Sequence, residues 1–216
     1  MVDVIYLTIE KCPVYKESID SLKHLPFKYK LHKISDKGRW AELINKGIQE
    51  STGDILIMDD DVILNRNTFK GFDKKIADII GFRLLFPNGK VQHGGCVVRN
   101  GQVEVLADKY DKPIVVPHCT ASLQYINRDV IHTIGGMSLD YPGYQFEDVD
   151  FCFRALQAGL KIVCLPNEAI HCQGATKEQD KEFSSKALIN NEILKSKFLN
   201  NPKFIKVLNE RRFDIQ

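Results

Sequence analysis

The stretch Asp54–Leu64, DILIMDDDVIL, decides how this chain is interpreted. Its apolar run Ile55–Met58 has the composition of a strand that is buried on both faces. Three consecutive carboxylates, Asp59, Asp60 and Asp61, follow that run directly. Adjacent carboxylates repel each other by about 1–4 kcal/mol at about 4–6 Å, depending on how much water surrounds them. We therefore expect a positively charged partner at this strand end.

The composition is that of an ordinary globular protein. A length of 216 residues suggests one large domain, and 44% hydrophobic residues are enough for a sizeable core. The formal net charge of +2 gives no reason to expect nucleic-acid binding. No apolar run approaches the roughly 20 residues of a membrane span, and the first residues lack the features of a signal peptide. We expect a cytoplasmic protein.

The six cysteines are scattered along the chain and form no Cys-x-x-Cys pair. Two of them, Cys152 and Cys164, lie within apolar segments, where free buried thiols are common. We expect free cysteines rather than a disulfide framework.

Apolar and helical patterns alternate in the first part of the chain. Such alternation predicts parallel strands joined by right-handed crossovers, with ligands bound beyond the carboxyl ends of the strands. The three carboxylates would lie at that edge. The expected elements are a strand at Val2–Thr8, a helix at Val14–His24, a strand at Tyr29–Ile34, a helix at Trp40–Glu50 and a strand at Ile55–Met58.

The remainder indicates a mixed α/β fold. Asn88-Gly89 between apolar runs predicts a hairpin, a helix fits Val149–Ala158, and Leu160–Pro166 fits a strand. From about residue 177 the pattern is helical and basic. We expect one domain over residues 1–176, with a mainly parallel sheet flanked by helices, and a helical extension over 177–216 that packs on it.

Two later groups of residues have functional chemistry: the acids Glu147, Asp148 and Asp150, and the pair His171-Cys172. The Asp-x-Asp arrangement suits Mg²⁺ or Mn²⁺, and an added imidazole favours Mn²⁺. Simpler interpretations remain open. The acids at 147 and 148 would also stabilise a helix N-terminus by about 0.3–1 kcal/mol each, and a single histidine is often structural.

Four segments, taken in order, resemble the family 2 glycosyltransferases of the GT-A fold. The resemblance extends over roughly residues 2–200, and its strongest part is the Asp-x-Asp followed about ninety residues later by the FEDVDFCFRALQAGLK segment, a strand and a histidine. The segments are ESIDSL (17–22), INKGIQESTGDILIMDDDVIL (44–64), GFRLLFPNGKVQHGGCVV (81–98) and GGMSLDYPGYQFEDVDFCFRALQAGLKIVCLPNEAIHCQGAT (135–176).

The resemblance implies a nucleotide-sugar donor and a bound Mn²⁺ or Mg²⁺. It makes Asp61 a direct metal ligand, places Asp59 at the ribose or at a metal-bound water, and gives His171 a further metal or diphosphate contact. It makes Asp148 the catalytic base, with Glu147 beside it touching the acceptor. One base and a direct displacement predict inversion at the anomeric carbon, while a retaining path, through a second nucleophilic carboxylate or a front-face mechanism, stays open.

The resemblance also implies a set of donor-binding residues. The family's usual arginine before Asn45 is Ile44 here, so Arg39, one turn earlier, is the candidate substitute. Simple turn chemistry explains His93, Gly136 and Asp36 about equally well, and Trp40 is interpreted as core packing. The donor-binding candidates are Thr8, Asp36, Asn45, Asp59, Asp60, His93, Gly135 and Gly136.

The expected partners are a UDP-, GDP- or dTDP-sugar and a glycan, lipid-linked saccharide or protein acceptor. The basic tail leaves peripheral membrane contact open, and the sequence does not predict an oligomeric state. Three rival functions are a nucleotidyltransferase-like enzyme, a catalytically inactive nucleotide-sugar-binding relative, and a zinc-binding module. The zinc ligands would come from His93/Cys96, His118/Cys119 and His171/Cys172, of which only His93 and Cys96 have the short spacing typical of zinc sites.

Overall fold

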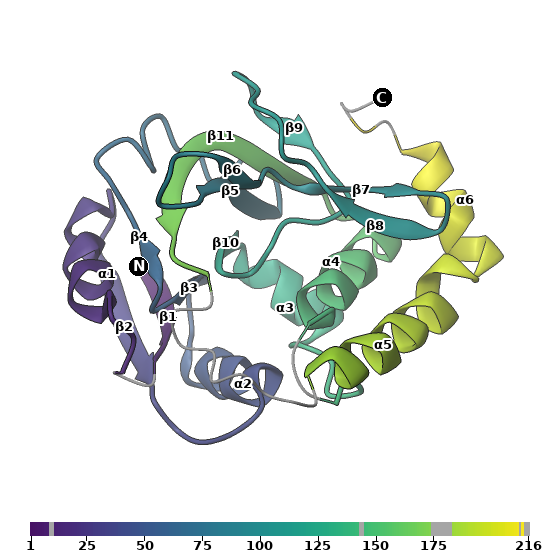
Figure 1. Cartoon of the computed structure of the whole chain (residues 1–216), viewed down its shortest axis with the longest axis horizontal. Coiled ribbons are helices and arrows are strands. Elements are labelled where there is room, and N and C mark those ends of the chain that lie inside the picture. Colours follow the sequence, from purple (N-terminus) through teal and green to yellow (C-terminus); the bar gives the residue numbers. More distant parts are fainter. Residues whose placement is uncertain (9–10, 143–144, 174–182, 212, 214–216) are drawn as a thin grey trace.

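The computed structural model describes residues 1–8, 11–142, 145–173, 183–211 and 213. A central sheet has the strand order β2-β1-β3-β10-β5-β11-β4, with β6 beside β5 and β9 beside β11, and β7 and β8 form a separate ribbon. Helices flank the sheet (Figure 1). The strands are β1 (Val2–Leu7), β2 (Tyr29–Ile34), β3 (Asp54–Asp59), β4 (Val62–Ile63), β5 (Ile79–Leu85), β6 (Val91–His93), β7 (Cys96–Arg99), β8 (Gln102–Val105), β9 (Ile114–Val115), β10 (Leu123–Ile126) and β11 (Ile162–His171). The helices are α1 (Tyr15–Ser21), η1 (Leu22–His24), α2 (Trp40–Glu50), α3 (Arg128–Ile134), α4 (Glu147–Gln157), α5 (Phe183–Leu194), η2 (Lys195–Leu199) and α6 (Pro202–Glu210).

The first three strands are parallel, as the alternating pattern predicts. In the register, Leu7 of β1 lies opposite both Ile34 of β2 and Asp59 of β3. The carboxyl ends of the three strands therefore meet at one edge of the sheet, and Asp60 and Asp61 follow β3 at that edge. The side chains of Ile55, Leu56, Ile57 and Met58 are fully buried, so the apolar run of β3 forms part of the core.

The second part of the sheet mixes directions. Strand β10 is antiparallel to both β3 and β5, between which it lies, whereas β5 and β11 are parallel. Strand β4 is antiparallel to the end of β11, and in this pair Val62 lies opposite His171. This pairing brings the last residue of β11 to the residue that directly follows the three carboxylates.

The hairpin predicted at Asn88-Gly89 joins β5 to β6, and Gly89 adopts the positive φ of 80° that this turn needs. Strand β11 is longer than predicted because it continues past an irregularity between Leu165 and Glu168 and ends at His171. Helix α4 begins at Glu147, two residues before the predicted start, so both Glu147 and Asp148 lie in its first turn.

Two of the helical elements that follow β11, η2 and α6, pack against α4. Phe198 of η2 and Phe204 of α6 contact Phe153 of α4, with ring centroids 5.5 and 4.7 Å from that ring. Residues 177–182 of the predicted helical extension lie outside the described part of the chain. Among the described helices none is long and apolar enough to cross a membrane, and all six cysteines are free thiols.

Candidate active site

Asp59, Asp61 and His171 come together at the carboxyl edge of the sheet. One ligand atom from each lies within 4.8 Å of the other two. His171 Nε2 is 3.2 Å from Asp61 Oδ1, and both side chains are about nine-tenths buried. Asp61 is held from the backbone as well, because its carbonyl accepts a 2.8 Å hydrogen bond from the Cys172 amide. Three residues predicted as metal ligands are therefore neighbours.

The His171 ring is fixed by Gln92 of β6. Nδ1 of the ring lies 2.6 Å from Gln92 Oε1, and an amide oxygen only accepts hydrogen bonds, so Nδ1 carries the proton. In the neutral ring Nε2 then presents its lone pair to Asp61. Two lone-pair donors that face each other at 3.2 Å form a favourable arrangement when a proton or a cation lies between them.

The electrostatics of Asp59 also fit a cation. Burial raises the pKa of this carboxyl from 3.8 to about 6, and repulsion from Asp61 adds to the increase, while His171 partly offsets it. The indole N–H of Trp40 contacts Asp59 Oδ1 at 3.4 Å. Trp40, whose expected role is core packing or a helix face, is therefore also a neighbour of the acidic cluster. Two carboxylate oxygens and one imidazole suit Mn²⁺ or Mg²⁺.

The middle acid, Asp60, is turned toward β1. Its Oδ2 accepts a 2.7 Å hydrogen bond from the Thr8 hydroxyl, and both residues are buried. Thr8 follows β1, where its amide donates to the Ile34 carbonyl at 3.0 Å. Together these two contacts of Thr8 join the carboxyl ends of β1, β2 and β3.

The predicted base, Asp148, lies against a buried histidine. Its Oδ2 is 3.3 Å from His118 Nε2 and also accepts a hydrogen bond from the Ala121 amide. Burial acts to raise the pKa of Asp148, but the charge of the adjacent His118, together with the hydrogen bond from the Ala121 amide, outweighs burial and lowers the pKa from 3.8 to about 2. Asp148 is consequently ionised throughout the physiological pH range.

The environment of the neighbouring Glu147 raises the pKa of its carboxyl instead of lowering it. The side chain is 3% exposed, and burial raises its pKa from 4.5 to about 7. Its Oε1 is buried and accepts no hydrogen bond from the described residues. The two residues before it, Gln145 and Phe146, have positive φ angles of 88° and 74°, an uncommon backbone conformation at the start of a helix. Two adjacent carboxyls with pKa values pushed apart are typical of acid–base sites.

Asp150, the third acid of this segment, is not part of the site. It is fully buried, and its oxygens contact Arg154 Nε at 2.6 Å, Lys197 Nζ at 2.5 Å and the Tyr141 hydroxyl at 3.0 Å. These contacts join α4 to η2. The helix places Asp150 two residues from Asp148, on a different face, which explains why adjacent acids have different surroundings.

The predicted donor-binding residues Asn45, Gly135 and Gly136 lie together. Asn45 donates to the Met137 carbonyl at 2.9 Å and accepts from its amide at 2.7 Å. A Cβ atom at Gly136 would lie 2.2 Å from Asn45 Oδ1, so this close approach requires glycine. Gly135 has a φ of 75°. The amide of Asn45 therefore fixes the loop after α3.

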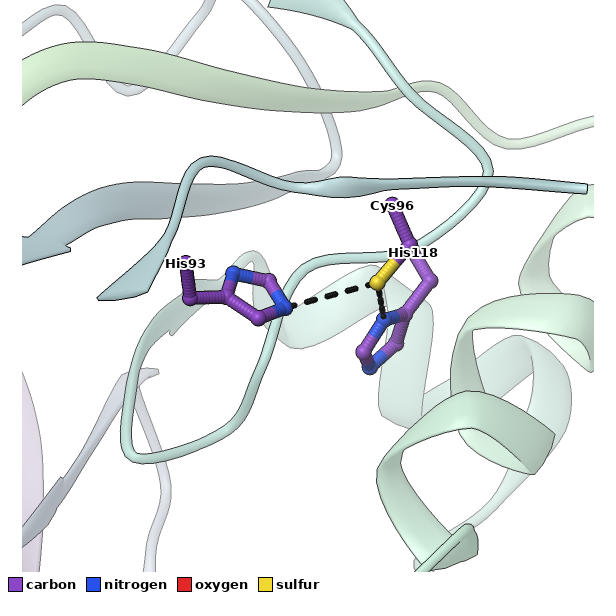
Figure 2. Close-up of side chains that lie close together, drawn as sticks. All are labelled: His93, Cys96 and His118. Carbon is purple, nitrogen blue, oxygen red and sulfur yellow. Dashed lines mark hydrogen bonds between the residues drawn. The ribbon is translucent and has the colours of Figure 1, made fainter. Parts of the chain in front are cut away.

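Other candidates lie elsewhere. Asp36 is half-exposed and pairs with Lys46 at 2.5 Å. Arg39, the candidate nucleotide contact, pairs with Glu42 and donates to the Leu139 carbonyl at 3.0 Å. His93 is buried beside Cys96 and His118, and these three form a second group of ligand-type atoms within 4.8 Å (Figure 2). Cys119 and Cys172 belong to neither described group, so the zinc module proposed from three His/Cys pairs does not assemble in that form.

The sequence interpretation missed three contacts. Gln92 fixes His171, Trp40 contacts Asp59, and His118 pairs with Asp148. The only available signal was the position of Gln92 and His118 beside residues already singled out in the sequence. It did not specify these contacts, which depend on strand register.

No family model matches the sequence. The uncharacterized protein y4gI of Sinorhizobium fredii is 22% identical over 179 residues, which is 71% of this chain but only 19% of that protein. The chain thus spans about a fifth of the length of this curated relative.

Solved structures show a clearer likeness. GalNAc-T7 with UDP, GalNAc and Mn²⁺ superposes with a TM-score of 0.58 at 11% identity, over 79% of this chain and 43% of that one. The mannosyltransferase PcManGT from Pyrobaculum calidifontis, in complex with GDP-Man and Mn²⁺, gives 0.57 at 13% identity over 96% and 68%. S. aureus TarS 1–349 gives 0.55 at 14% identity over 95% and 71%.

The chain has the GT-A fold. The predicted mainly parallel sheet with flanking helices is confirmed. At these levels of identity the likeness establishes the fold, and the chemistry has to be argued from the residues of this chain.

Proposed function

We propose that this protein is a metal-dependent glycosyltransferase of the family 2 type, which transfers a sugar from a nucleotide-diphospho-sugar to an acceptor hydroxyl with inversion. The observation that carries the proposal is the convergence of Asp59, Asp61 and His171 at the carboxyl edge of the GT-A sheet. GalNAc-T7 and PcManGT were crystallised with a nucleotide or nucleotide sugar and Mn²⁺, which supports the same class of donor and ion here.

The metal ligands in this proposal are Asp61, Asp59 and His171. When bound there, Mn²⁺ or Mg²⁺ supplies Lewis-acid stabilisation of the negative charge on the departing nucleoside diphosphate. Gln92 keeps the proton of His171 on Nδ1 and so leaves Nε2 for the ion. Thr8 and Asp60 brace the strand ends beneath the donor, and the loop held by Asn45, with Gly135 and Gly136, borders it.

We assign the base to Asp148. An acceptor hydroxyl is a poor nucleophile near neutral pH, so it must lose its proton as it attacks the anomeric carbon. Asp148 remains ionised because its pKa is about 2, and Glu147 beside it would contact the acceptor. Attack from the face opposite the leaving diphosphate inverts the configuration. The acceptor in this proposal is a glycan, lipid-linked saccharide or protein, and the free cysteines support a cytoplasmic setting.

A thermal-shift screen with UDP-, GDP- and dTDP-sugars, each with and without Mn²⁺, tests the proposal. A ligand that binds only the folded state stabilises it by about 2.7 kcal/mol at a concentration one hundred times its Kd. We expect one nucleotide class to raise the melting temperature only when Mn²⁺ is present, and Asp61→Ala to abolish that shift. If Asp61→Ala still shows the shift in melting temperature when no metal is present, the metal assignment is wrong. Donor binding without transfer or hydrolysis would indicate a catalytically inactive relative.

A further inference from the structure

A second group of ligand-type side chains is separate from the Asp59, Asp61 and His171 group, and the proposed transfer reaction does not use it as a metal site. His93 Nε2 lies 3.5 Å from Cys96 Sγ, and His118 Nδ1 lies 3.1 Å from the same sulfur (Figure 2). The three side chains are buried, with 8%, 1% and 4% of their surfaces exposed. Figure 2 shows the sulfur between the two rings, with a nitrogen of each ring turned toward it.

The two N–S separations match those of a tetrahedral zinc site, and the two ring nitrogens lie within 4.8 Å of each other. With Zn–S of about 2.3 Å and Zn–N of about 2.0–2.1 Å, tetrahedral ligands lie about 3.5 Å apart for N and S. The observed separations of 3.5 and 3.1 Å differ from that value by a few tenths of an ångström at most. We propose that His93, Cys96 and His118 bind a Zn²⁺ ion, with water in the fourth position.

The ligand types separate this site from the Asp59–Asp61–His171 cluster. A thiolate with two imidazoles selects zinc, whereas a cluster dominated by carboxylate oxygens suits Mn²⁺ or Mg²⁺. His93 and Cys96 also have the x₂ spacing common in zinc sites. The zinc site depends only on these ligand atoms and not on the proposed glycosyltransferase activity.

The backbone places the three ligand residues close together before any ion binds. His93 ends β6 and Cys96 begins β7, and the Cys96 amide donates a 2.9 Å hydrogen bond to the His118 carbonyl. Cys96 and His118 are thus partners in a β-bridge. Between His93 and Cys96, Gly95 has a φ of 93°, which permits the sharp turn that directs both side chains to one side.

An outer carboxylate completes the arrangement. His118 Nε2, the nitrogen away from Cys96, lies 3.3 Å from Asp148 Oδ2, and among the described residues this buried atom has no well-aligned hydrogen bond. Metal-binding histidines usually direct their second nitrogen to a carboxylate in this way. A metal on Nδ1 keeps the proton on Nε2, where it faces Asp148. The zinc ion would then supply the positive charge opposite this carboxylate.

Loading the site requires two proton changes. Cys96 releases its thiol proton to solvent and binds as thiolate. His93 Nδ1 now accepts a 3.1 Å hydrogen bond from the Gly95 amide, so the proton of this ring is on Nε2. Binding through Nε2 moves that proton to Nδ1, which requires the Gly94–Gly95 peptide to turn its N–H away. Two successive glycines give the backbone the freedom to do so.

Metal titration of the full-length protein tests the proposal. Protein stripped with a chelator under reducing conditions is titrated with Zn²⁺ and, separately, with Co²⁺. We expect one tightly bound Zn²⁺ per chain and, with Co²⁺, a thiolate-to-metal charge-transfer band together with the intense d–d bands of tetrahedral Co²⁺. Absence of the thiolate band in folded wild-type protein would overturn the proposal without using any variant.

Matched variants locate the ion. Cys96→Ser should lose the charge-transfer band, whereas Cys12→Ser, which removes another buried thiol outside the group, should keep it. Asp148→Ala should weaken Zn²⁺ binding by about 10–100-fold, as expected for an outer-shell carboxylate. Asp61→Ala should retain the band even if it abolishes Mn²⁺-dependent donor binding, so the two proposals fail separately. A band that survives Cys96→Ser, or that disappears in Asp61→Ala, would exclude this site.

Discussion

His171 Nε2 lies 3.2 Å from Asp61 Oδ1, although Asp61 follows β3 and His171 ends β11. Their meeting depends on the antiparallel pairing of β4 with the end of β11, in which Val62 lies opposite His171. A loop residue after one strand and the last residue of another thus become joint ligand candidates.

Gln92 should control metal affinity without touching the ion. Its Oε1 fixes His171 through Nδ1 at 2.6 Å, and loss of such a partner typically weakens metal binding about 10–100-fold. We expect Gln92→Met to raise the Mn²⁺ dissociation constant by that factor, measured by calorimetry or by electron paramagnetic resonance of free Mn²⁺. Gln157→Met, an exposed change in α4, is the control. Equal affinities in both variants would contradict a positioning role for Gln92.

Asp59 should make the metal-free protein less stable as pH rises. Its folded-state pKa of about 6 lies above the ordinary value of 3.8. The contribution of Asp59 to the free energy of unfolding is therefore fully present below pH 3.8 and is lost as the pH rises through about 6. We expect Asp59→Asn to stabilise the chelator-treated protein at pH 8 by about 1–3 kcal/mol, or about 2–4 °C in melting temperature per kcal/mol.

The comparison needs a surface control. Asp36→Asn changes a half-exposed acid paired with Lys46 and should alter the melting temperature only slightly. Mn²⁺ should reduce the advantage of Asp59→Asn, because the ion compensates the wild-type carboxylates. A wild type that is more stable than Asp59→Asn at pH 8 without metal would show that these charges are already balanced.

The two adjacent carboxyls should be distinguishable by pH profile. If Asp148 is the base, Asp148→Asn should lower kcat about 10²–10⁴-fold while donor affinity is retained. The wild-type rate should then show no acid limb from this residue above pH 5, since its pKa is about 2. An acid limb near pH 7 that disappears in Glu147→Gln would instead assign the base to Glu147, whose pKa is about 7.

Gly136 should be intolerant of a methyl group because of Asn45. An added Cβ would lie 2.2 Å from Asn45 Oδ1, and overpacking of this kind typically costs about 1–3 kcal/mol. We expect Gly136→Ala to lower the free energy of unfolding in urea by that amount. The loss should be smaller in an Asn45→Ala background, where the clashing atom is absent. Strictly additive effects would show that the strain arises elsewhere.

Much of the fold follows from local patterns. The alternation of apolar strands and amphipathic helices up to residue 59 predicts β1, β2 and β3 as parallel neighbours, and Asn88-Gly89 predicts the β5–β6 hairpin. The insertion of β10 between β3 and β5 could not be predicted in this way. Strand order in a mixed sheet depends on contacts between distant segments, which local periodicity does not encode.

The candidate site, like the fold, is only partly predictable from local sequence. Residue types, together with the resemblance to family 2 glycosyltransferases, point to Asp59, Asp61, Asp148 and His171, whereas the partners of these residues depend on the three-dimensional arrangement. His118 meets Asp148 because a β-bridge holds it beside Cys96. Asp150, two residues from Asp148, instead faces Arg154 and Lys197. Sequence proximity suggested one acidic group, and helical geometry divides it.

The β4–β11 pairing, only two residue pairs long, has a consequence for dynamics. Short ladders fray more readily than the long parallel strands beside them, and opening this one would separate Asp61 from His171. A bound cation would therefore stabilise the paired state of β4 and β11. The Cys172 amide donates a hydrogen bond to the Asp61 carbonyl, so slower hydrogen exchange at this amide would report that stabilisation. Local folding and ion capture at this edge would be one coupled equilibrium.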